Sequence, residues 1–248
     1  MNHFDWKAFL MMNLFNVKQI IGIDRLISLL PVLLVLWLAG CAHTATLKES
    51  AGAEITFQIS FESSPQQSTI DYYIVYSTTT FDLNTNANNN YFFIPGKSYD
   101  QTSLDTASGS KGLTYFYATY FQSWSGVIAL QPSNIELTRG PFLGSTTNDN
   151  AHYAYQSTNL SVSNYSVSGS TISVTIPISS LGISGNNLYF SIVTSKGDNT
   201  NNTLDLVSDI QFVELISNRP ALNGENIASP YQPVERAGKI KSWSITVQ

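Results

Sequence analysis

Apolar side chains at every second position are the feature that most constrains how this chain folds. Residues 55–61 read ITFQISF, residues 70–76 read IDYYIVY and residues 172–178 read ISVTIPI. A period of two places alternate side chains on opposite faces of an extended strand, so each segment predicts a strand with one face in a core. Pro177 lacks an amide donor, which predicts that the third of these strands lies at a sheet edge or that its donor position at residue 177 faces solvent.

Further strands are predicted over 113–121, 127–130, 188–193, 204–215 and 240–247, and a weaker one around Tyr165, flanked by Val162 and Val167. Segment 113–121 is aromatic on both faces, which is typical of a central strand covered on both sides. After Cys41 no ten-residue stretch keeps a helical apolar stripe. Short strands separated by Gly, Asn and Ser predict a two-sheet antiparallel β-sandwich of about 9–10 strands, formed by residues 54–248 as a single domain. Residues 81–90, 98–112, 140–150 and 218–235 are predicted to be long loops.

The first forty residues have the pattern of a helical signal segment. Residues 26–38 read LISLLPVLLVLWL, an uncharged run that follows the basic residues Lys7, Lys18 and Arg25. A basic stretch, a short apolar run and small residues at its end are typical of a secretory signal peptide. The run is shorter than the roughly 20 residues that cross a bilayer. Translation from Met11 or Met12 would give a leader of more usual length.

Leu38-Ala39-Gly40-Cys41 directly follows this run and resembles the lipobox of bacterial lipoproteins. The resemblance implies cleavage of residues 1–40 and a diacylglyceryl thioether on Cys41, with acyl chains such as palmitate holding the protein on a membrane. Residues 41–53 would then be a tether between the lipid and the sandwich. The residue after the cysteine is Ala42, which by the same resemblance favours the outer membrane if the organism is Gram-negative.

Composition narrows the possible partners. Only 12% of the residues are charged and the net charge is −5. Phosphate binding needs clustered Lys and Arg, so we expect no nucleic-acid partner. The single Cys excludes a disulfide within the chain.

The residues that support catalysis or zinc binding are scarce. His152 is the one histidine of the predicted domain, and no G-x-S-x-G motif presents a serine nucleophile. One histidine and no domain cysteine also exclude a structural zinc site. Asp205 and Asp209 share a face of their predicted strand, and we interpret that face as solvated. We therefore predict that the protein is not an enzyme and has no catalytic residue.

Calcium needs only oxygen ligands and is harder to exclude. Asp82, Asn84 and Asn86 supply oxygens at alternate positions, as in the first half of a calcium loop. Ala87 stands where such a loop wants Gly, and Phe93 stands where the closing Glu belongs. We expect no cofactor, and these three residues are the weak alternative.

Aromatic residues are the remaining candidates for binding. All 13 Tyr lie after residue 40. Tyr and Trp rings stack on the apolar faces of sugars while their polar tips form hydrogen bonds. Candidate rings for such a platform are Trp124, Tyr120, Tyr117, Tyr73 and Tyr231. Trp124 lies between Gln122-Ser123 and Ser125-Gly126, and this turn-like context predicts an exposed ring. The alternative is that these rings fill the core.

Three segments resemble pieces of the carbohydrate-binding family 9/DOMON type of β-sandwich. They are residues 71–82 (DYYIVYSTTTFD), 174–182 (VTIPISSLG) and 188–198 (LYFSIVTSKGD). The resemblance covers about a third of the chain after Cys41 and implies a sandwich that binds a glycan.

Three functions remain open at this point. The first is a membrane-anchored envelope lipoprotein whose noncatalytic sandwich binds a glycan or an envelope protein. The second is a purely structural envelope lipoprotein, which a contiguous exposed apolar patch would favour. The third is an envelope hydrolase, which two carboxylates in one cleft would favour.

Overall fold

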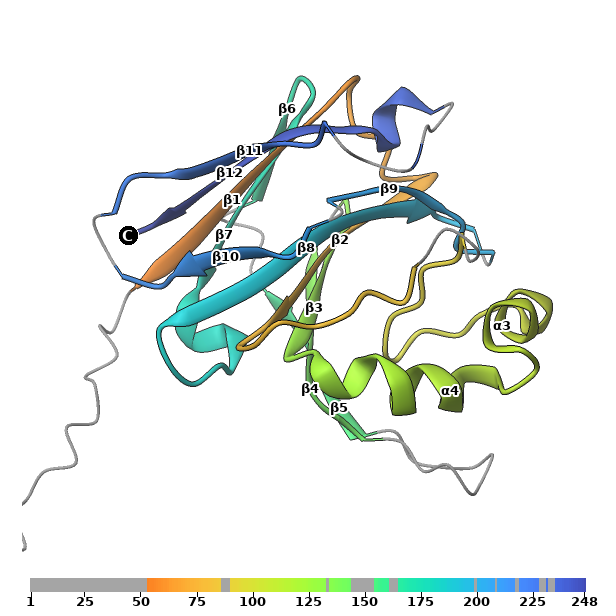
Figure 1. Cartoon of the computed structure of the whole chain (residues 1–248). Coiled ribbons are helices and arrows are strands. Elements are labelled where there is room, and N and C mark those ends of the chain that lie inside the picture. Colours follow the sequence, from red (N-terminus) through yellow and green to blue (C-terminus); the bar gives the residue numbers. More distant parts are fainter. Residues whose placement is uncertain are drawn as a thin grey trace, which may run out of the picture. The chain divides into compact units, whose positions relative to one another are not determined.

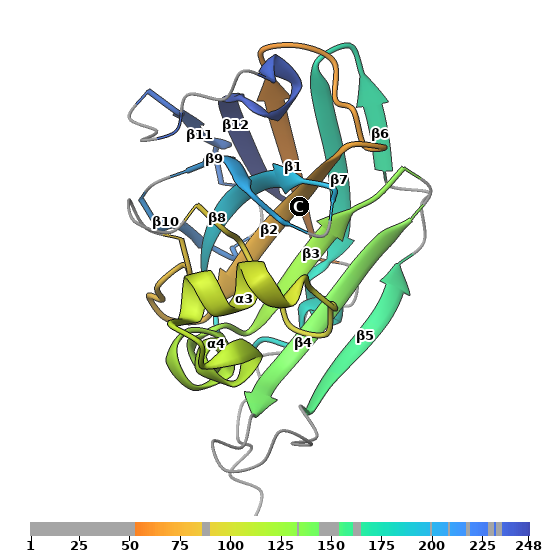
Figure 2. The same ribbon diagram turned by 90° about the vertical axis from the view of Figure 1, so that its right-hand side faces the viewer.

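The fold is an all-β sandwich of two antiparallel sheets. The computed structural model describes residues 53–85, 90–132, 134–143, 154–160, 165–198, 200–207, 209–216, 219–227, 231 and 235–248. Its 5-stranded sheet has the order β11-β12-β1-β7-β6, and its 7-stranded sheet has the order β10-β8-β2-β3-β4-β5 with β9 also paired to β8. Figures 1 and 2 show the two layers from perpendicular directions.

The strands are β1 (Glu54–Phe61), β2 (Ile70–Ser77), β3 (Gly126–Leu130), β4 (Ile135–Leu143), β5 (Ala154–Leu160), β6 (Tyr165–Ser168), β7 (Thr171–Pro177), β8 (Asn187–Lys196), β9 (Thr203–Leu206), β10 (Gln211–Glu214), β11 (Leu222–Glu225) and β12 (Ile240–Val247). The helices are α3 (Gln101–Ser108) and α4 (Gly112–Thr119), with 3₁₀ turns η1 (Phe121–Ser123), η3 (Ile178–Leu181) and η4 (Arg236–Gly238).

The predicted alternation builds the main core between the sheets. In β1, Ile55, Phe57, Ile59 and Phe61 are all at most 1% exposed, while the residues between them lie on the outer face. The flanking strands β12 and β7 alternate in register with β1, so their apolar residues point into the same layer. Tyr72, Ile74 and Tyr76 of β2 face them from the other sheet. The sandwich prediction is confirmed, with more strands than the expected number.

The outer face of the 7-stranded sheet carries a second aromatic core, which the alternation did not predict. Tyr73 and Val75 of β2 and Val127 of β3 point away from the main core, and α3, α4 and apolar side chains from residues 81–83 and 91–94 cover them. Figures 1 and 2 show both helices on this side of the sheet. The sheet is therefore buried on both faces over its central strands.

Residues 113–121 do not form the predicted strand. They form helix α4 and the turn η1, which bury Phe116, Tyr117 and Phe121. Because almost every residue in this segment is apolar, Leu113, Phe116, Tyr117 and Tyr120 also satisfy the spacing of three and four residues of a helix. The apolar residues of this segment therefore fit the period of two of a strand as well as the period of 3.6 of a helix.

Two other expectations need correction. The predicted loop 98–112 contains helix α3, which begins after Asp100, whose carboxylate accepts a hydrogen bond from the backbone N–H of Ser103, and ends at the left-handed Gly109. The predicted strand 204–215 is two strands: β9 pairs with residues 193–195 of β8, and β10 pairs with residues 187–190.

The signal segment, Cys41 and the tether to residue 52 lie outside the described residues. Among the residues that are described, neither helix has the length and apolar character needed to cross a membrane.

Candidate functional site

The predicted aromatic platform is wrong for most of its rings. Trp124 is 3% exposed, Tyr117 is 1% exposed and Tyr73 is 2% exposed, so none of them presents a face to solvent. The indole N–H of Trp124 donates to the backbone oxygen of Asp82 at 2.9 Å. The polar neighbours of Trp124 predict an exposed ring, but Phe81 and Phe92 pack against it, with ring centroids 6.4 and 6.1 Å away.

Tyr120 and Tyr231 are partly exposed and pack at the margin of the second core. Tyr120 stacks on Phe116 with ring centroids 6.2 Å apart. The rings named in the prediction thus belong mainly to a core, which was the alternative interpretation.

A polar pocket opens beside this second core, where the outer face of the sheet is not covered by the helices. Its cavity volume is about 270 Å³. The floor comes from β2, β3 and β4, and one wall comes from residues 94–97. Its lining residues are Asp71, Tyr72, Tyr73, Ile94, Pro95, Gly96, Lys97, Ala129, Leu130, Gln131, Glu136 and Thr138. We call this space the Lys97 pocket.

Lys97 is the centre of a hydrogen-bonded cluster in this pocket. Its ammonium Nζ donates to Asp71 Oδ2 at 2.7 Å, to Tyr73 Oη at 3.2 Å and to Asn201 Oδ1 at 3.1 Å. The phenol of Tyr73 in turn donates to Asp71 Oδ2 at 2.9 Å. These contacts join three separate segments: the start of β2, the loop before α3 and the turn before β9.

Burial keeps the Tyr73 phenol of this cluster protonated. Burial raises the pKa of the Tyr73 phenol well above its ordinary value, and the nearby Tyr99 phenol and Asp71 carboxylate raise it further. Tyr73 therefore keeps its proton at neutral pH and remains a donor to Asp71. The side chains of Lys97 and Asp71 are 32% and 28% exposed, so their polar atoms are reachable from the pocket.

Asn201 is the member of the Lys97 cluster whose side chain is fixed in place by burial and by its own hydrogen bonds. Its side chain is fully buried and its backbone is left-handed, with φ of 54°. Its amide Nδ2 donates to the backbone oxygen of Phe92, which leaves Oδ1 directed at Lys97. Asp198 Oδ1 accepts from the backbone N–H and the hydroxyl of Thr200, so this Asn-rich turn is held by its own side chains.

A second carboxylate reaches the pocket from β4. Tyr73 pairs with Ala129, and Ala129 pairs with Glu136, so the three side chains lie in one row on the outer face. Gln131 extends its amide toward Glu136, with Nε2 and Oε2 3.5 Å apart. Asp71, two residues before Tyr73, lies on the same face. The pocket therefore combines two acidic groups, one ammonium and amide groups above an apolar floor.

The sequence contained a weak signal for this pocket. Asp71 is the one charged residue in the strand IDYYIVY, and a carboxylate beside buried tyrosines needs a partner. Nothing in the sequence singled out Lys97, because its loop meets β2 only through tertiary contacts.

The weak calcium alternative finds no support in the contacts of Asn84. This side chain is fully buried, its Nδ2 donates to the backbone oxygen of Phe93 at 2.7 Å, and its Oδ1 accepts from the N–H of Phe93. Asp82 is exposed, and Asn86 lies outside the described residues. Within the described parts of the chain, no three His, Cys, Asp or Glu side chains are grouped to hold a metal.

The prediction that Asp205 and Asp209 share a solvated strand face is wrong for Asp205. It is fully buried, whereas Asp209 is exposed. Its carboxylate accepts from the backbone N–H of Leu206 at 2.8 Å and of Ile240 at 2.7 Å, and from Asn226 Nδ2 at 3.2 Å. It therefore fastens β9 to the start of β12 and is not part of a solvated face. His152 lies outside the described residues.

Comparisons with protein-family models, with curated proteins and with solved structures find no match to this chain.

Proposed function

We propose that this protein is a lipid-anchored lipoprotein of the bacterial cell envelope whose β-sandwich binds a glycan, without cleaving it, in the Lys97 pocket. The observation that carries the binding role is the cluster of Lys97, Asp71 and Tyr73 beside an opening of about 270 Å³. Small-ligand sites are concave and place a few convergent polar groups above apolar surface. The anchor rests on the lipobox resemblance at Cys41.

The chemistry of the pocket suits a sugar. Sugar hydroxyl groups both donate and accept, and the pocket offers acceptors on Asp71 and Glu136 and donors on Lys97 and Gln131. Ala129, Leu130 and Pro95 provide apolar surface for the C–H faces of a ring. A glycan of one or two sugar units would fill a cavity of this size.

A hydrolase is the second candidate, and one observation favours it. Asp71 and Glu136 both line the pocket, as a two-carboxylate mechanism requires. Against it, Asp71 Oδ2 already accepts from Lys97 and from Tyr73, so both donors compete with any proton exchange with a substrate. Binding without cleavage is therefore the better-supported function.

The test of binding is a glycan screen on the full-length protein, repeated with two matched variants. Lys97 and Lys239 each form an ion pair, at 2.7 Å and 2.8 Å, with side chains 32% and 31% exposed. Only Lys97 lines the pocket. We expect Lys97→Met to lose binding of the captured glycan at least tenfold and Lys239→Met to retain it, since each charged hydrogen bond contributes about 1.5–3 kcal/mol. Equal affinity of both variants would overturn the assignment, and release of a cleaved product by the wild type would favour the hydrolase.

The test of the anchor is mass spectrometry of the protein extracted from membranes. A mature chain beginning at Cys41 and carrying acyl mass supports the proposal. Cys41→Ser should then leave an unprocessed precursor, and membrane retention of a chain with a bare thiol would refute the anchor.

A further inference from the structure

An apolar groove lies at the end of the sandwich where the first strand begins. It spans the gap between β10, an edge of one sheet, and β11, an edge of the other, and its cavity volume is about 300 Å³. The apolar lining is Phe212, Val213, Pro220, Ala221, Leu222, Ile245 and Val247, with Glu214 and Arg219 also lining it. We call it the β10–β11 groove.

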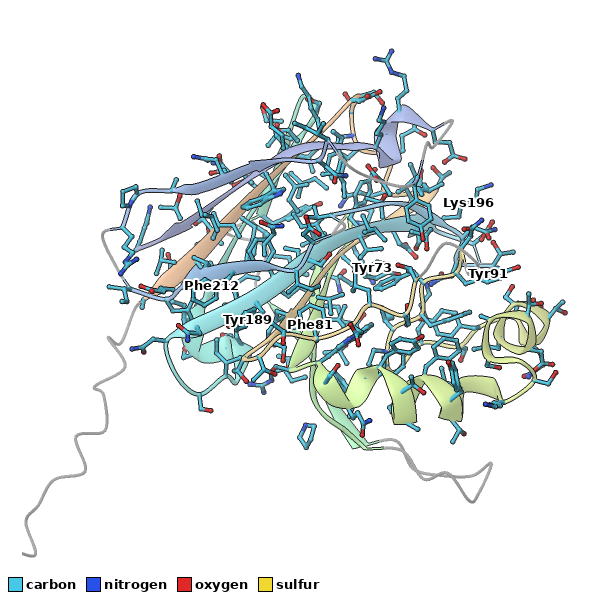
Figure 3. The ribbon with its side chains drawn as sticks, in the orientation of Figure 1. Tyr73, Phe81, Tyr91, Tyr189, Lys196 and Phe212 are labelled. Carbon is cyan, nitrogen blue, oxygen red and sulfur yellow. The ribbon has the colours of Figure 1, made fainter. Side chains whose placement is uncertain are left out.

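Exposed apolar side chains stand beside this groove. Phe212 is 41% exposed and Ile216, two residues beyond Glu214, is 42% exposed. The ring of Tyr189 contacts that of Phe212, with centroids 5.1 Å apart. Figure 3 shows Phe212 and Tyr189 together near this end of β8, with Lys196 near its other end. An apolar groove with the exposed ring of Phe212 in its lining, and with Ile216 exposed nearby in the chain, marks an interaction site more strongly than a single exposed residue does.

The described chain enters the sandwich next to this groove. The backbone N–H of Glu54 donates to the oxygen of Gln248 at 3.0 Å, and Ile55 pairs with Val247, which itself lines the groove. Figure 1 shows the start of β1 and the C-terminus at the same end as the β10–β11 connection.

The length of chain before this point limits how far the groove can be from a membrane. Twelve residues separate Cys41 from Glu54. A chain of that length reaches about 40 Å when fully extended, which is the upper limit of the distance between Cys41 and Glu54. Lipid on Cys41 would therefore keep this end of the sandwich close to the bilayer surface.

We propose that the β10–β11 groove is a membrane-docking surface, with Phe212 and Ile216 inserted among the lipid headgroups; this inference rests on the proposed lipid anchor. Aromatic and aliphatic side chains gain free energy at the boundary between headgroups and acyl chains. Arg219 also lines the groove, and its guanidinium forms an ion pair with Glu214 at 2.5 Å. Its side chain is 57% exposed, so donors that this pair does not use can contact lipid phosphates while its stem covers apolar surface.

Docking in this way leaves the Lys97 pocket available. Along β8, Leu188 pairs with Val213 in the groove, whereas Ser195 pairs with Asp71 in the pocket. Seven residues of extended strand separate these two positions, which corresponds to about 23 Å. The groove and the pocket lie at opposite ends of one strand, so one end can rest on lipid while the other binds a ligand.

The single cysteine makes a direct test possible. Once Cys41 carries lipid, an introduced cysteine is the only free thiol. Phe212→Cys and, as a control, Ser68→Cys would each be labelled with an environment-sensitive fluorophore in the mature anchored protein. Ser68 is exposed in the turn that follows β1, at the end away from the groove. The labelled proteins are placed in vesicles of phosphatidylethanolamine and phosphatidylglycerol that contain spin-labelled lipid as a quencher. Ile216→Cys is the second probe if Phe212→Cys does not fold.

We expect several-fold stronger quenching and a blue-shifted emission at position 212 relative to position 68. Weak quenching at both positions in a vesicle-bound, lipid-modified protein would overturn the docking surface while leaving the anchor intact. Equal quenching at positions 212 and 68 would also overturn the docking surface. A disulfide-linked dimer through position 212 would overturn it as well, because it would show a second copy of the chain in the groove. Two free thiols by mass would mean that Cys41 is unmodified, which would refute the anchor and this inference together.

Discussion

The ammonium group of Lys97 lies 2.7 Å from Oδ2 of Asp71 and fastens the loop before α3 to the start of β2. Lys239 and Glu62 form an ion pair of almost the same length, 2.8 Å, near the end of β1. The two pairs differ in their surroundings, because Lys97 has two further acceptors, on Tyr73 and Asn201.

This difference predicts unequal effects on stability. Lys97→Met should lower the free energy of unfolding by about 1–2 kcal/mol, because it removes three hydrogen bonds from a partly screened ammonium group. Lys239→Met should have a smaller effect, since Lys239 lacks the two further acceptors that Lys97 has, and Glu62 keeps a second partner in Arg236. Urea denaturation of both variants measures the difference, and a larger loss for Lys239→Met would contradict it.

The buried carboxylate of Asp205 predicts a large effect of its removal. Asp205→Ala leaves the N–H groups of Leu206 and Ile240 without their acceptor in the core, and should cost about 3–5 kcal/mol. Asp209→Ala, at an exposed position, should change stability by less than about 0.5 kcal/mol. Similar midpoints for the two variants in urea would show that the Asp205 contacts are not formed.

Burial of Trp124 predicts that it stabilises the fold. Trp124→Ala should lower the free energy of unfolding by about 3–5 kcal/mol, because it opens a cavity in the second aromatic core and removes the hydrogen bond to Asp82. Phe212→Ala, at a 41% exposed ring, is the control and should cost less than about 1 kcal/mol. If thermal denaturation gives Trp124→Ala the stability of the wild type, the ring is exposed as first expected.

Alkaline pH should unfold the protein through its buried tyrosines. Burial raises the pKa of Tyr72 to about 12, and it also raises the pKa values of Tyr73, Tyr76 and Tyr99. In the unfolded chain these phenols ionise near pH 10, so the unfolded state loses protons first. Their contribution to stability is complete below about pH 10 and is lost as the pH rises toward 12.

Circular dichroism and phenolate absorbance, recorded together during an alkaline titration, check this. The absorbance of these tyrosines should rise only as the β-sheet signal falls. Tyr72→Phe should reduce the steepness with which the stability of the fold is lost as the pH rises. Full ionisation of all tyrosines with an unchanged β-sheet signal would contradict the burial of their hydroxyl groups.

The residues that followed one clear period were predicted correctly from sequence. Strand β1 alternates strictly between apolar and polar side chains, and only an extended conformation buries all four of its apolar residues. Helix α4 was not predicted because its segment is apolar at nearly every position, and such a pattern does not separate a strand from a helix. What decided its conformation was the second core that it covers.

The candidate site was harder to predict for a related reason. Trp124 has polar neighbours in sequence, but Phe81 and Phe92 help to bury it, and these contacts form only when distant parts of the chain fold together. The Lys97 cluster joins residues 71, 97 and 201, which are brought together by strand pairing and by the left-handed turn at Asn201. The spacing of these three residues along the chain gives no indication that they are in contact.

The central claim is that the Lys97 pocket holds the glycan. It is tested most directly by photo-crosslinking a diazirine derivative of the glycan captured in the screen to the wild-type protein and locating the adducts by mass spectrometry. We predict adducts on peptides containing residues 71–73, 94–97 and 129–138, suppressed by excess free glycan. Competed adducts confined to α4 or to the outer face of the 5-stranded sheet would contradict the account.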